Sequence, residues 1–254
     1  MTQINPNENV TQLTPSDMNI KRSLSVTARN LIRKSMTAAL STHLHEESWP
    51  YGSLVLAACT HDSTPLLLMS DLAEHTKSII SDNRVSLMYD GTKELTNPLS
   101  GPRVTVLGRA FRDFTPSNRL RFLSRHPTAS KYADFGDFGI YRVAVKRAHL
   151  VLGFGEIHWL DGKDLIWQGN AEKFVASEES LLLVLNSKYK NKLGLIAEKL
   201  FGECSGAWHA IGADPDGLDL KHGSRTTRIN FSQPVTNPRE IESKIVEVYS
   251  EILA

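Results

Sequence analysis

Cysteine and net charge are both scarce in this sequence. Only two of its 254 residues are cysteines, Cys59 and Cys204, and they lie far apart without a Cys-x-x-Cys pair. This spacing indicates neither a disulfide framework nor a zinc motif, so we expect two buried thiols in a reducing, cytoplasmic compartment. Lys and Arg number 29 against 28 Asp and Glu, a net charge of +1. Nucleic-acid binding is not indicated, because it needs an excess of cations to displace the counterions of phosphates.

Long apolar runs are missing as well. The most apolar stretches, residues 54–59 and 181–185, have the length of core segments, so nothing predicts insertion into a membrane. The first twenty residues are polar and lack the basic-then-apolar order of a secretion signal. With 41% hydrophobic and 22% charged residues, the composition is that of a globular chain.

Common catalytic motifs are also absent. Gly153-Phe154-Gly155 has no third glycine and does not open a predicted helix, so it is not a dinucleotide fingerprint. The sequence contains neither the nucleophile elbow of hydrolases nor the phosphate-binding loop of nucleotide triphosphatases. These absences favour a ligand-binding protein whose chemistry a bound cofactor would supply.

Two short motifs resemble metal sites but lack ligands. His43 and His45 would share one face of a strand, yet no third ligand follows at a useful spacing. Residues 214–219 read DPDGLD, but the glycine comes two positions early for a calcium loop, and the twelfth position is Arg225 rather than Glu. We therefore predict a turn at residues 214–217 and no metal site.

The order of predicted elements divides the chain into three parts. Residues 1–24 have no periodicity and predict a flexible leader, followed by a helix capped by Ser25. Residues 25–168 read mainly as short strands separated by turn residues, which favours an antiparallel barrel over a parallel sheet. Residues 169–254 are richer in helix patterns and predict a small C-terminal α+β domain. The predicted fold class is therefore α+β.

Two local patterns make narrower predictions. Asp161-Gly162 lies between two strand-like runs and predicts a tight hairpin. Residues 238–253 predict a closing amphipathic helix, because Ile241, Ile245 and Val248 fall on one face.

A candidate anion site lies at the start of a predicted helix over residues 74–80. Ser70 ends a strand, and His75, Thr76 and Lys77 follow where the helix opens. Backbone amides, a hydroxyl and an ammonium would meet there at the positive end of the helix dipole, which suits a phosphate monoester. The alternative is that these residues form the hydrated first turn of a surface helix.

A second candidate lies where residues 50–55 enter a strand. Gly52 is followed by the hydroxyl of Ser53. Glycine inside a strand often marks a close approach to the backbone, for example by a flat ring. The alternative, a bulge or a barrel corner, explains the glycine equally well.

Arginines gather near two elements. They are Arg119, Arg121 and Arg125, together with His126, around a predicted helix, and Arg103, Arg109 and Arg112 on or just after a predicted strand. The planar guanidinium suits carboxylates and phosphates, so a second anionic ligand is one interpretation. The other, which we favour, is that these arginines are solvated or pair with local acids.

Several longer strings resemble a known family. In chain order they are WPYGSLV at 49–55, PLLLMSDLAEHT at 65–76, DNRVSL at 82–87, PLSGPR at 98–103, GRA at 108–110, RFL at 121–123, HP at 126–127, YA at 132–133 and GFG at 153–155. They resemble the FMN-binding split-barrel family related to pyridoxamine 5′-phosphate oxidase, in its haem-utilisation, HugZ-like branch. The resemblance covers residues 25–168, and residues 212–217 and 228–231 resemble the small α+β domain often appended in that branch.

The resemblance implies a fold, ligands and a partner. The fold is an antiparallel six-stranded split β-barrel that forms a homodimer, with ligand sites between the subunits. FMN is the implied cofactor, and haem is a further ligand or substrate. In the family, the strand like residues 51–54 lies beside the flavin ring, and the segment like residues 70–77 receives its phosphate. The implied cofactor-binding residues are Tyr51, Gly52, Ser53, Leu54, Ser70, His75, Thr76 and Lys77.

Two departures limit what the resemblance carries over. The appended domain usually opens with Met-Asn-x-Asp-His, whereas residues 185–189 here read LNSKY, so the roles of that Asp and His are not transferred. The sequence also ends at Ala254 without a His-rich tail, so no axial haem ligand is assigned. For His149 and His158 we expect structural roles, and no catalytic residue is assigned.

Two functions follow from the resemblance. One is redox chemistry in haem utilisation or degradation, by an FMN-dependent oxidoreductase or a haem-degrading oxygenase. The other is non-catalytic, a regulatory or binding partner in tetrapyrrole metabolism. A true pyridoxamine-phosphate oxidase is a weaker interpretation, because the second domain and the haem-branch strings are not expected of it. The expected partners are a second copy of the chain and a flavin or tetrapyrrole, with neither nucleic acid nor a membrane.

Overall fold

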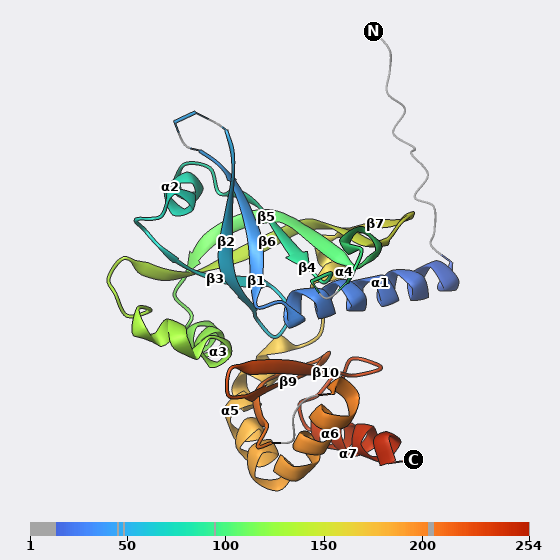
Figure 1. The fold of residues 1–254 in the computed structure, drawn as a ribbon. Helices are drawn as coiled ribbons and strands as arrows, with labels where there is room; N and C mark the ends of the chain where they lie inside the picture. Colours follow the sequence, from blue (N-terminus) through green and yellow to red (C-terminus); the bar gives the residue numbers. More distant parts are fainter. Residues whose placement is uncertain (1–13, 45, 48, 94, 203–205, 254) are drawn as a thin grey trace.

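The chain builds two β-sheets, each packed with its own helices (Figure 1). The computed structural model describes residues 14–44, 46–47, 49–93, 95–202 and 206–253. The strands of the first sheet are β1 (Thr37–His43), β2 (Pro50–Cys59), β3 (Pro65–Ser70), β4 (Arg84–Asp90), β5 (Arg103–Asp113), β6 (Phe138–Gly153) and β7 (Glu156–Asp161). Around it lie α1 (Pro15–Lys34), α2 (Glu74–Ser81), η1 (Pro98–Ser100), α3 (Pro116–Arg125), η2 (Pro127–Lys131) and α4 (Gly162–Leu165).

The first sheet closes on itself. Its strands follow the order β3-β2-β1-β4-β5-β6-β7, and β3 also pairs with β6. This second pairing makes β1 to β6 an antiparallel barrel of six strands, while β7 extends the sheet beyond β6. The predicted six-stranded antiparallel barrel and the α+β fold class are confirmed.

Alternating side chains fill the barrel. On β1, Leu40 is fully buried while its neighbours Ala39 and Ser41 are exposed. Inward side chains from all six barrel strands, Leu87 and Val106 among them, form one hydrophobic core. A small barrel of this kind has an interior filled by its own side chains, so the barrel is a scaffold whose accessible face is the outer one.

One strand is apolar on both faces because α3 covers its outside. Leu66 and Leu68 of β3 pack with Phe122 of α3 in a separate hydrophobic cluster, while Leu67 and Met69 point into the barrel. The continuous apolar run of β3 therefore follows from burial on both faces.

The N-terminal helix begins earlier than predicted. α1 starts at Pro15 and is capped by Thr14, whose hydroxyl accepts a hydrogen bond from the Asp17 amide at 3.2 Å. Ser25, the predicted cap, lies inside this helix and its hydroxyl donates to the Lys21 carbonyl at 2.9 Å. The prediction of a leader reaching residue 24 is wrong for residues 15–24, because the capping box and Pro15 start the helix first. Residues 1–13 lie outside the described part of the chain.

The tight hairpin predicted at Asp161-Gly162 is wrong. β6 and β7 turn instead at Gly155, whose φ of +82° favours glycine. Gly162 begins the short helix α4, where a side chain would come within 2.2 Å of the Val145 carbonyl oxygen. The glycine is therefore required by close packing rather than by a hairpin.

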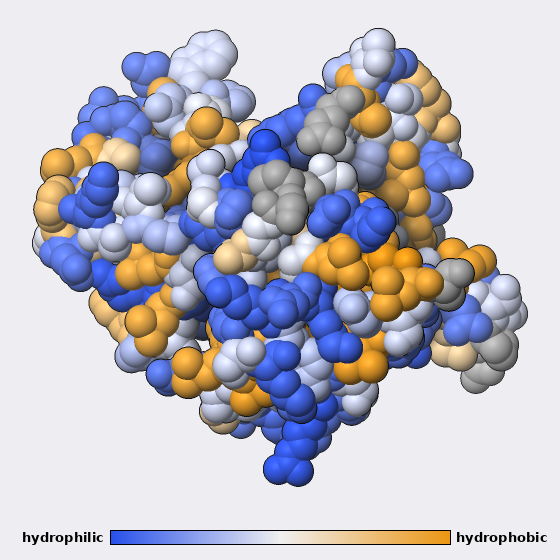
Figure 2. Space-filling view, turned by 60° about the horizontal axis from the view of Figure 1, so that its bottom comes forward, coloured by the Kyte–Doolittle hydropathy of each residue, from blue (hydrophilic) through white to orange (hydrophobic). Residues whose placement is uncertain are grey.

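The second sheet belongs to a C-terminal unit with its own core. Its elements are α5 (Ala171–Lys188), α6 (Lys190–Phe201), β8 (His209–Asp214), β9 (Gly217–His222), β10 (Arg225–Asn230) and α7 (Glu240–Leu253). Trp208 is fully buried in a cluster that includes Ile241 and Ile245 of α7, which confirms the amphipathic closing helix. On the face seen in Figure 2, apolar side chains gather in separate patches among polar ones. The boundary predicted after Gln168 stays a prediction.

The structure tests the predictions about the cysteines and about membrane insertion only for the residues that it describes. Cys59 is a buried free thiol, which confirms its predicted burial, and burial raises the pKa of this thiol. Cys204 and His45 lie outside the described residues. In the part of the chain that the structure describes, no helix combines the length and the apolar character needed to cross a bilayer. Within the same residues, no three His, Cys, Asp or Glu side chains are grouped to hold a metal ion.

A network of charged side chains joins the two units. The barrel unit supplies Arg29, Arg33, Arg121 and Arg125, and the C-terminal unit supplies Glu178, Asp214, Asp216, Asp219 and Arg228. The turn predicted at residues 214–217 is confirmed, and it carries two of these carboxylates to the arginines of α1 and α3. Arg121 pairs with Glu178 and Asp214, and Arg125 pairs with Asp219. These acids lie 57 or more residues away in the chain rather than locally.

The carboxylates of the turn are fully enclosed by arginines. Asp216 binds Arg29 through both oxygens, at 2.7 and 2.8 Å, and Arg33 at 3.0 Å. Asp214 is 0% exposed; burial by itself would raise its pKa, but the charges of Arg228 and Arg33 hold the pKa well below the usual value. Both carboxylates are therefore ionised in the folded protein.

Breaking one member of this network is expected to destabilise the protein strongly. Asp216→Asn leaves Arg29 and Arg33 short of a buried counter-charge, so the free energy of unfolding should fall by about 3–5 kcal/mol. Urea unfolding of the whole chain measures it. The matched control is Asp134→Asn, because Asp134 pairs with Arg119 at the surface and its side chain is 87% exposed; we expect a change below about 1 kcal/mol. Equal losses in both variants would contradict a buried, coupled network.

Candidate ligand-binding groove

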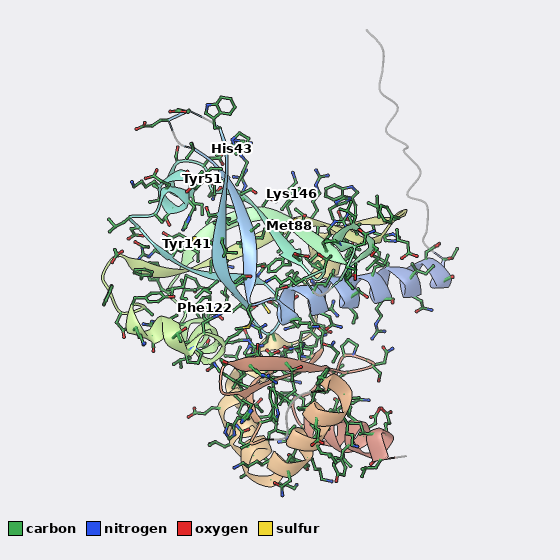
Figure 3. The ribbon with its side chains drawn as sticks, in the orientation of Figure 1. His43, Tyr51, Met88, Phe122, Tyr141 and Lys146 are labelled. Atoms are coloured by element: carbon green, nitrogen blue, oxygen red, sulfur yellow. The ribbon has the colours of Figure 1, made fainter. Side chains whose placement is uncertain are left out.

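A groove with a volume of about 740 Å³ crosses the outer face of the barrel. It is lined by residues of β1, β2, β4, β5 and β6, and this size is ordinary for a small-molecule site. Its basic side chains are His43, Arg84, Arg109, Lys146 and Arg147. None of the described residues that line the groove is acidic. Figure 3 labels His43 and Lys146 on the barrel, and Phe122 near the opposite end, beside the C-terminal unit.

Strand pairing arranges the outer face in rows. Arg84 of β4 lies opposite Arg109 of β5, in a basic row at one end of the groove. In the next row, Ser86 lies opposite both Leu107 of β5 and Ser41 of β1. The small side chains of Ser86 and Ser41 leave room over the sheet beside Leu107, which accounts for the hollow.

A third row on the same face is apolar. Met88 lies opposite Ala39 on one side and Thr105 on the other, and Ala39 lies opposite Leu54 of β2. The outer face thus passes from basic through small to apolar side chains over three successive rows. Such a gradient suits a flat ligand with an anionic edge and an apolar body.

A β-bulge places two cations side by side at the groove. The register between β5 and β6 shifts between Leu107 and Gly108, so Lys146 has no opposite residue and both Lys146 and Arg147 are exposed. A side chain at Gly108 would come within 2.5 Å of the Ala144 carbonyl oxygen, so the close approach of the strands requires glycine. Bulges of this kind commonly redirect side chains next to functional sites.

Most of these cations lack an ionic partner. Arg109 donates to the Asn83 side-chain oxygen at 2.7 Å, and the Arg147 guanidinium lies 4.3 Å from the centre of the Trp159 ring. Neither they nor Lys146 form an ion pair with any described residue. Arg84 differs, because it is held by Asp82. Uncompensated cations in a groove raise the local concentration of anions.

The predicted ring-lining residues of β2 divide between two faces. Tyr51 and Ser53 are partly buried, whereas Gly52 and Leu54 lie on the exposed outer face. Leu54 is 78% exposed, and a side chain added at Gly52 would meet nothing within 4 Å. Because strand side chains alternate, one flat ring on the outer face can contact Gly52 and Leu54 but not the side chains of the other pair.

Of the predicted phosphate residues near α2, Ser70 and Lys77 are engaged with acidic side chains, whereas the buried hydroxyl of Thr76 has no hydrogen-bond partner among the described residues. Ser70 donates to the Asp137 carboxylate and accepts from the Leu72 amide at 3.1 Å. Lys77 pairs with Glu74 at 2.7 Å, and Thr76 is 0% exposed.

At the same helix start, partial burial lowers the pKa of His75, which favours its neutral form. An FMN phosphate at this position would meet nearby carboxylates, so the residues as placed fit a phosphate poorly. The assignment of Tyr51, Gly52, Ser53, Leu54, Ser70, His75, Thr76 and Lys77 to a cofactor stays a prediction.

A second hollow, of about 690 Å³, adjoins the groove and shares Arg109 and Phe111 with it. Here the charges are balanced, because Arg112 binds both oxygens of Asp71 at 2.7 and 2.8 Å. The Tyr141 hydroxyl lies 3.4 Å from the same carboxylate. This hollow extends the groove but contributes little free positive charge.

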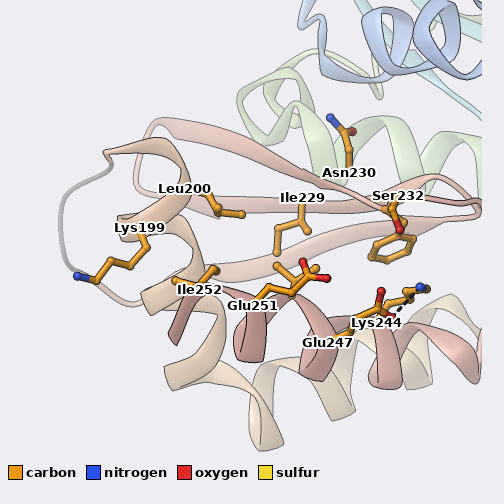
Figure 4. A pocket seen from close by; sticks show the side chains of 11 residues that line it. Lys199, Leu200, Ile229, Asn230, Ser232, Lys244, Glu247, Glu251 and Ile252 are labelled. Atoms are coloured by element: carbon orange, nitrogen blue, oxygen red, sulfur yellow. Dashed lines mark hydrogen bonds and ion pairs between the residues drawn. The ribbon is translucent and has the colours of Figure 1, made fainter. Parts of the chain in front are cut away.

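A third hollow, of about 640 Å³, lies in the C-terminal unit (Figure 4). Its rim carries Lys199 and Lys244 but also Glu247 and Glu251, and Lys244 pairs with Glu247 at 2.7 Å. Compensated charge and the absence of any predicted site residue distinguish it from the groove on the barrel.

The comparisons with known proteins identify the family. Residues 21–166 match the family described as "CREG, beta-barrel". The chain belongs to this CREG beta-barrel family. The family match spans the whole barrel, and the predicted membership of a split-barrel family is confirmed.

One curated relative is a plant protein. Over 129 residues, or 49% of this chain, the sequence is 33% identical to the non-canonical heme oxygenase HOZ, chloroplastic, of Arabidopsis thaliana. The matched part is 39% of the length of the Arabidopsis protein.

Solved structures extend the likeness over both units. Atu2129 of Agrobacterium tumefaciens, a protein of unknown function, has a TM-score of 0.73 and 25% identity, covering 94% of this chain and 100% of that one. A heme binding protein from Mycobacterium smegmatis has a TM-score of 0.52 and 23% identity over 91% of this chain and 97% of its own, a likeness of fold alone.

Sequence reasoning missed most of the groove. From the sequence, Arg109 is one possible anion ligand for which we favour solvation or a local ion pair, and His43 is a candidate only for a metal site. Lys146 and Arg147 were not singled out. Two adjacent charges inside a strand of this CREG-family barrel were the available signal, because strict alternation would send one of them into the core.

Gly108 is expected to control the bulge. Gly108→Ala forces the strands apart at the Ala144 carbonyl, so the free energy of unfolding should fall by about 1–3 kcal/mol, measured by urea unfolding. Gly136→Ala is the matched control, because a side chain there would meet nothing within 4 Å. Equal stability of the two variants would show that β5 and β6 do not need the close approach at Gly108.

Proposed function

We propose that this chain binds haem in the outer-face groove and acts in haem utilisation or breakdown. The observation that carries the proposal is a set of cations, Arg109, Lys146 and Arg147, that form no ion pair with any acid among the described residues and lie beside a strip of small and apolar side chains. Haem is a flat apolar molecule with two carboxylates on one edge, so its chemistry complements this arrangement. The Arabidopsis relative, named a heme oxygenase, supports the same ligand.

FMN is the second candidate ligand, implied by the split-barrel resemblance. Its ring would lie on the outer face near Gly52 and Leu54, and its phosphate would take the groove cations. The start of α2 near Lys77, which the resemblance implies for the phosphate, fits it less well because acids already bind Ser70 and Lys77. Bound haem or flavin would supply the redox chemistry, while the described residues bind and orient the ligand.

Visible spectroscopy of the purified whole chain tests the ligand and its place. Added haem should give a shifted, saturable Soret band, and Arg109→Ala should weaken this binding roughly tenfold, because a charge-assisted contact is worth about 1.5–3 kcal/mol. Lys77→Ala should leave haem binding unchanged, as should Arg239→Gln, an exposed cation of the C-terminal unit.

Other results assign the function differently. FMN bound more tightly than haem, and weakened by Lys77→Ala but not by Arg109→Ala, would move the site to α2. Haem that binds but does not decay with reductant and oxygen would favour the non-catalytic role in tetrapyrrole metabolism. A chain that binds neither ligand would contradict the proposal.

A homodimer belongs to the same proposal. Leu54 and Met88 are 78% and 41% exposed in the middle of a sheet, and an apolar row of this kind is commonly covered by another chain. We infer that a second copy covers it, which would place the groove between subunits. Light scattering should show a dimer that Leu54→Asp converts to monomer, whereas Leu120→Asp, at an exposed position of α3, should not. A monomeric wild-type chain would overturn this inference.

A further inference from the structure

The groove has two separate centres of positive charge. One is Arg109 on β5, and the other is Lys146 with Arg147 at the bulge of β6. Arg109 lies opposite Ala144, so Lys146 is two residues further along β6 on the same face.

Arg84 does not count as a third centre. Its guanidinium is held by Asp82, with the Nε atom 2.8 Å from one carboxylate oxygen. Hydrogen bonds from Arg84 lower the pKa of Asp82 to about 2, so this acid stays ionised and neutralises Arg84 near neutral pH.

The second centre is held in place. Trp159 on β7 contacts the Arg147 guanidinium with its ring, and the His149 ring lies 4.6 Å from the Trp159 ring, centre to centre. This stack keeps Arg147 beside Lys146 rather than free in solvent.

We propose that the groove recognises the carboxylate edge of a dicarboxylic tetrapyrrole, one carboxylate at each centre, with the apolar edge toward Ala39 and Met88. The inference rests on the proposed function and adds to it a ligand class and an orientation. Carboxylates rather than the metal then supply most of the selectivity, so metal-free porphyrins bind as well.

Binding of a metal-free porphyrin and of its ester tests whether the groove recognises the two carboxylates. Deuteroporphyrin and deuteroporphyrin dimethyl ester, in the same co-solvent, are titrated into the whole chain and followed by porphyrin fluorescence. The diacid should bind at least about tenfold more tightly than the ester, because esterification removes both charges. Arg109→Ala and Lys146→Ala should each weaken binding of the diacid severalfold and leave binding of the ester unchanged. Arg239→Gln should change neither.

The outcomes separate the inference from the proposed function. Equal affinity for the diacid and the ester would overturn the proposed recognition of carboxylates, and haem binding itself would remain supported. A loss with Arg109→Ala alone would overturn the two-centre arrangement. If neither porphyrin nor haem binds, the proposed function fails together with the inference.

Discussion

A closed barrel with a filled interior is the constraint on which this account depends. Pairing of β3 with β6 closes the sheet, and inward side chains such as Leu40, Leu87 and Val106 occupy the space inside. Any ligand must therefore use the outer face, whose residues are fixed by alternation and register. A slip of one residue in β4 would bury Arg84 and Ser86 and expose the core, so the register that stabilises the barrel also builds the groove.

The network of charged side chains between the two units lies at the opposite end of the barrel from the groove. Asp214 and Asp216 fasten the C-terminal unit to α1 and α3, near Phe122, whereas His43 lies at the other end of the barrel (Figure 3). Removing one partner of a buried ion network leaves a buried charge uncompensated and lowers the free energy of unfolding strongly. Replacing the whole network by apolar side chains would change that free energy much less. The network therefore fixes how the two units fit together, and the groove on the far side is left open for a ligand or a second chain.

Local sequence patterns predicted most helices, strands and turns. Features that depend on contacts between residues distant in sequence could not be predicted from them. The helix expected over residues 74–80 is α2, the turn at 214–217 is present, and the strands form the expected barrel. The sequence does not indicate Thr14 as a cap, because the residues after it lack apolar periodicity. The partners of Arg121 and the bulge at Gly108 were missed because both depend on strands or turns distant in sequence. The same applies to the groove: its cations come from separate strands that only the register brings together.

Paramagnetic broadening of the methionine methyl groups by haem iron tests the central claim most directly. The chain has five methionines, and two of them distinguish the competing sites. Met88 lies on the outer face beside the groove, and Met69 is buried next to Ser70, near the start of α2. With methyl-labelled protein and resonances assigned by single Met→Leu variants, we predict that the Met88 methyl signal broadens most. Broadening greatest at Met69, or none at Met88, would contradict a ligand on the outer face.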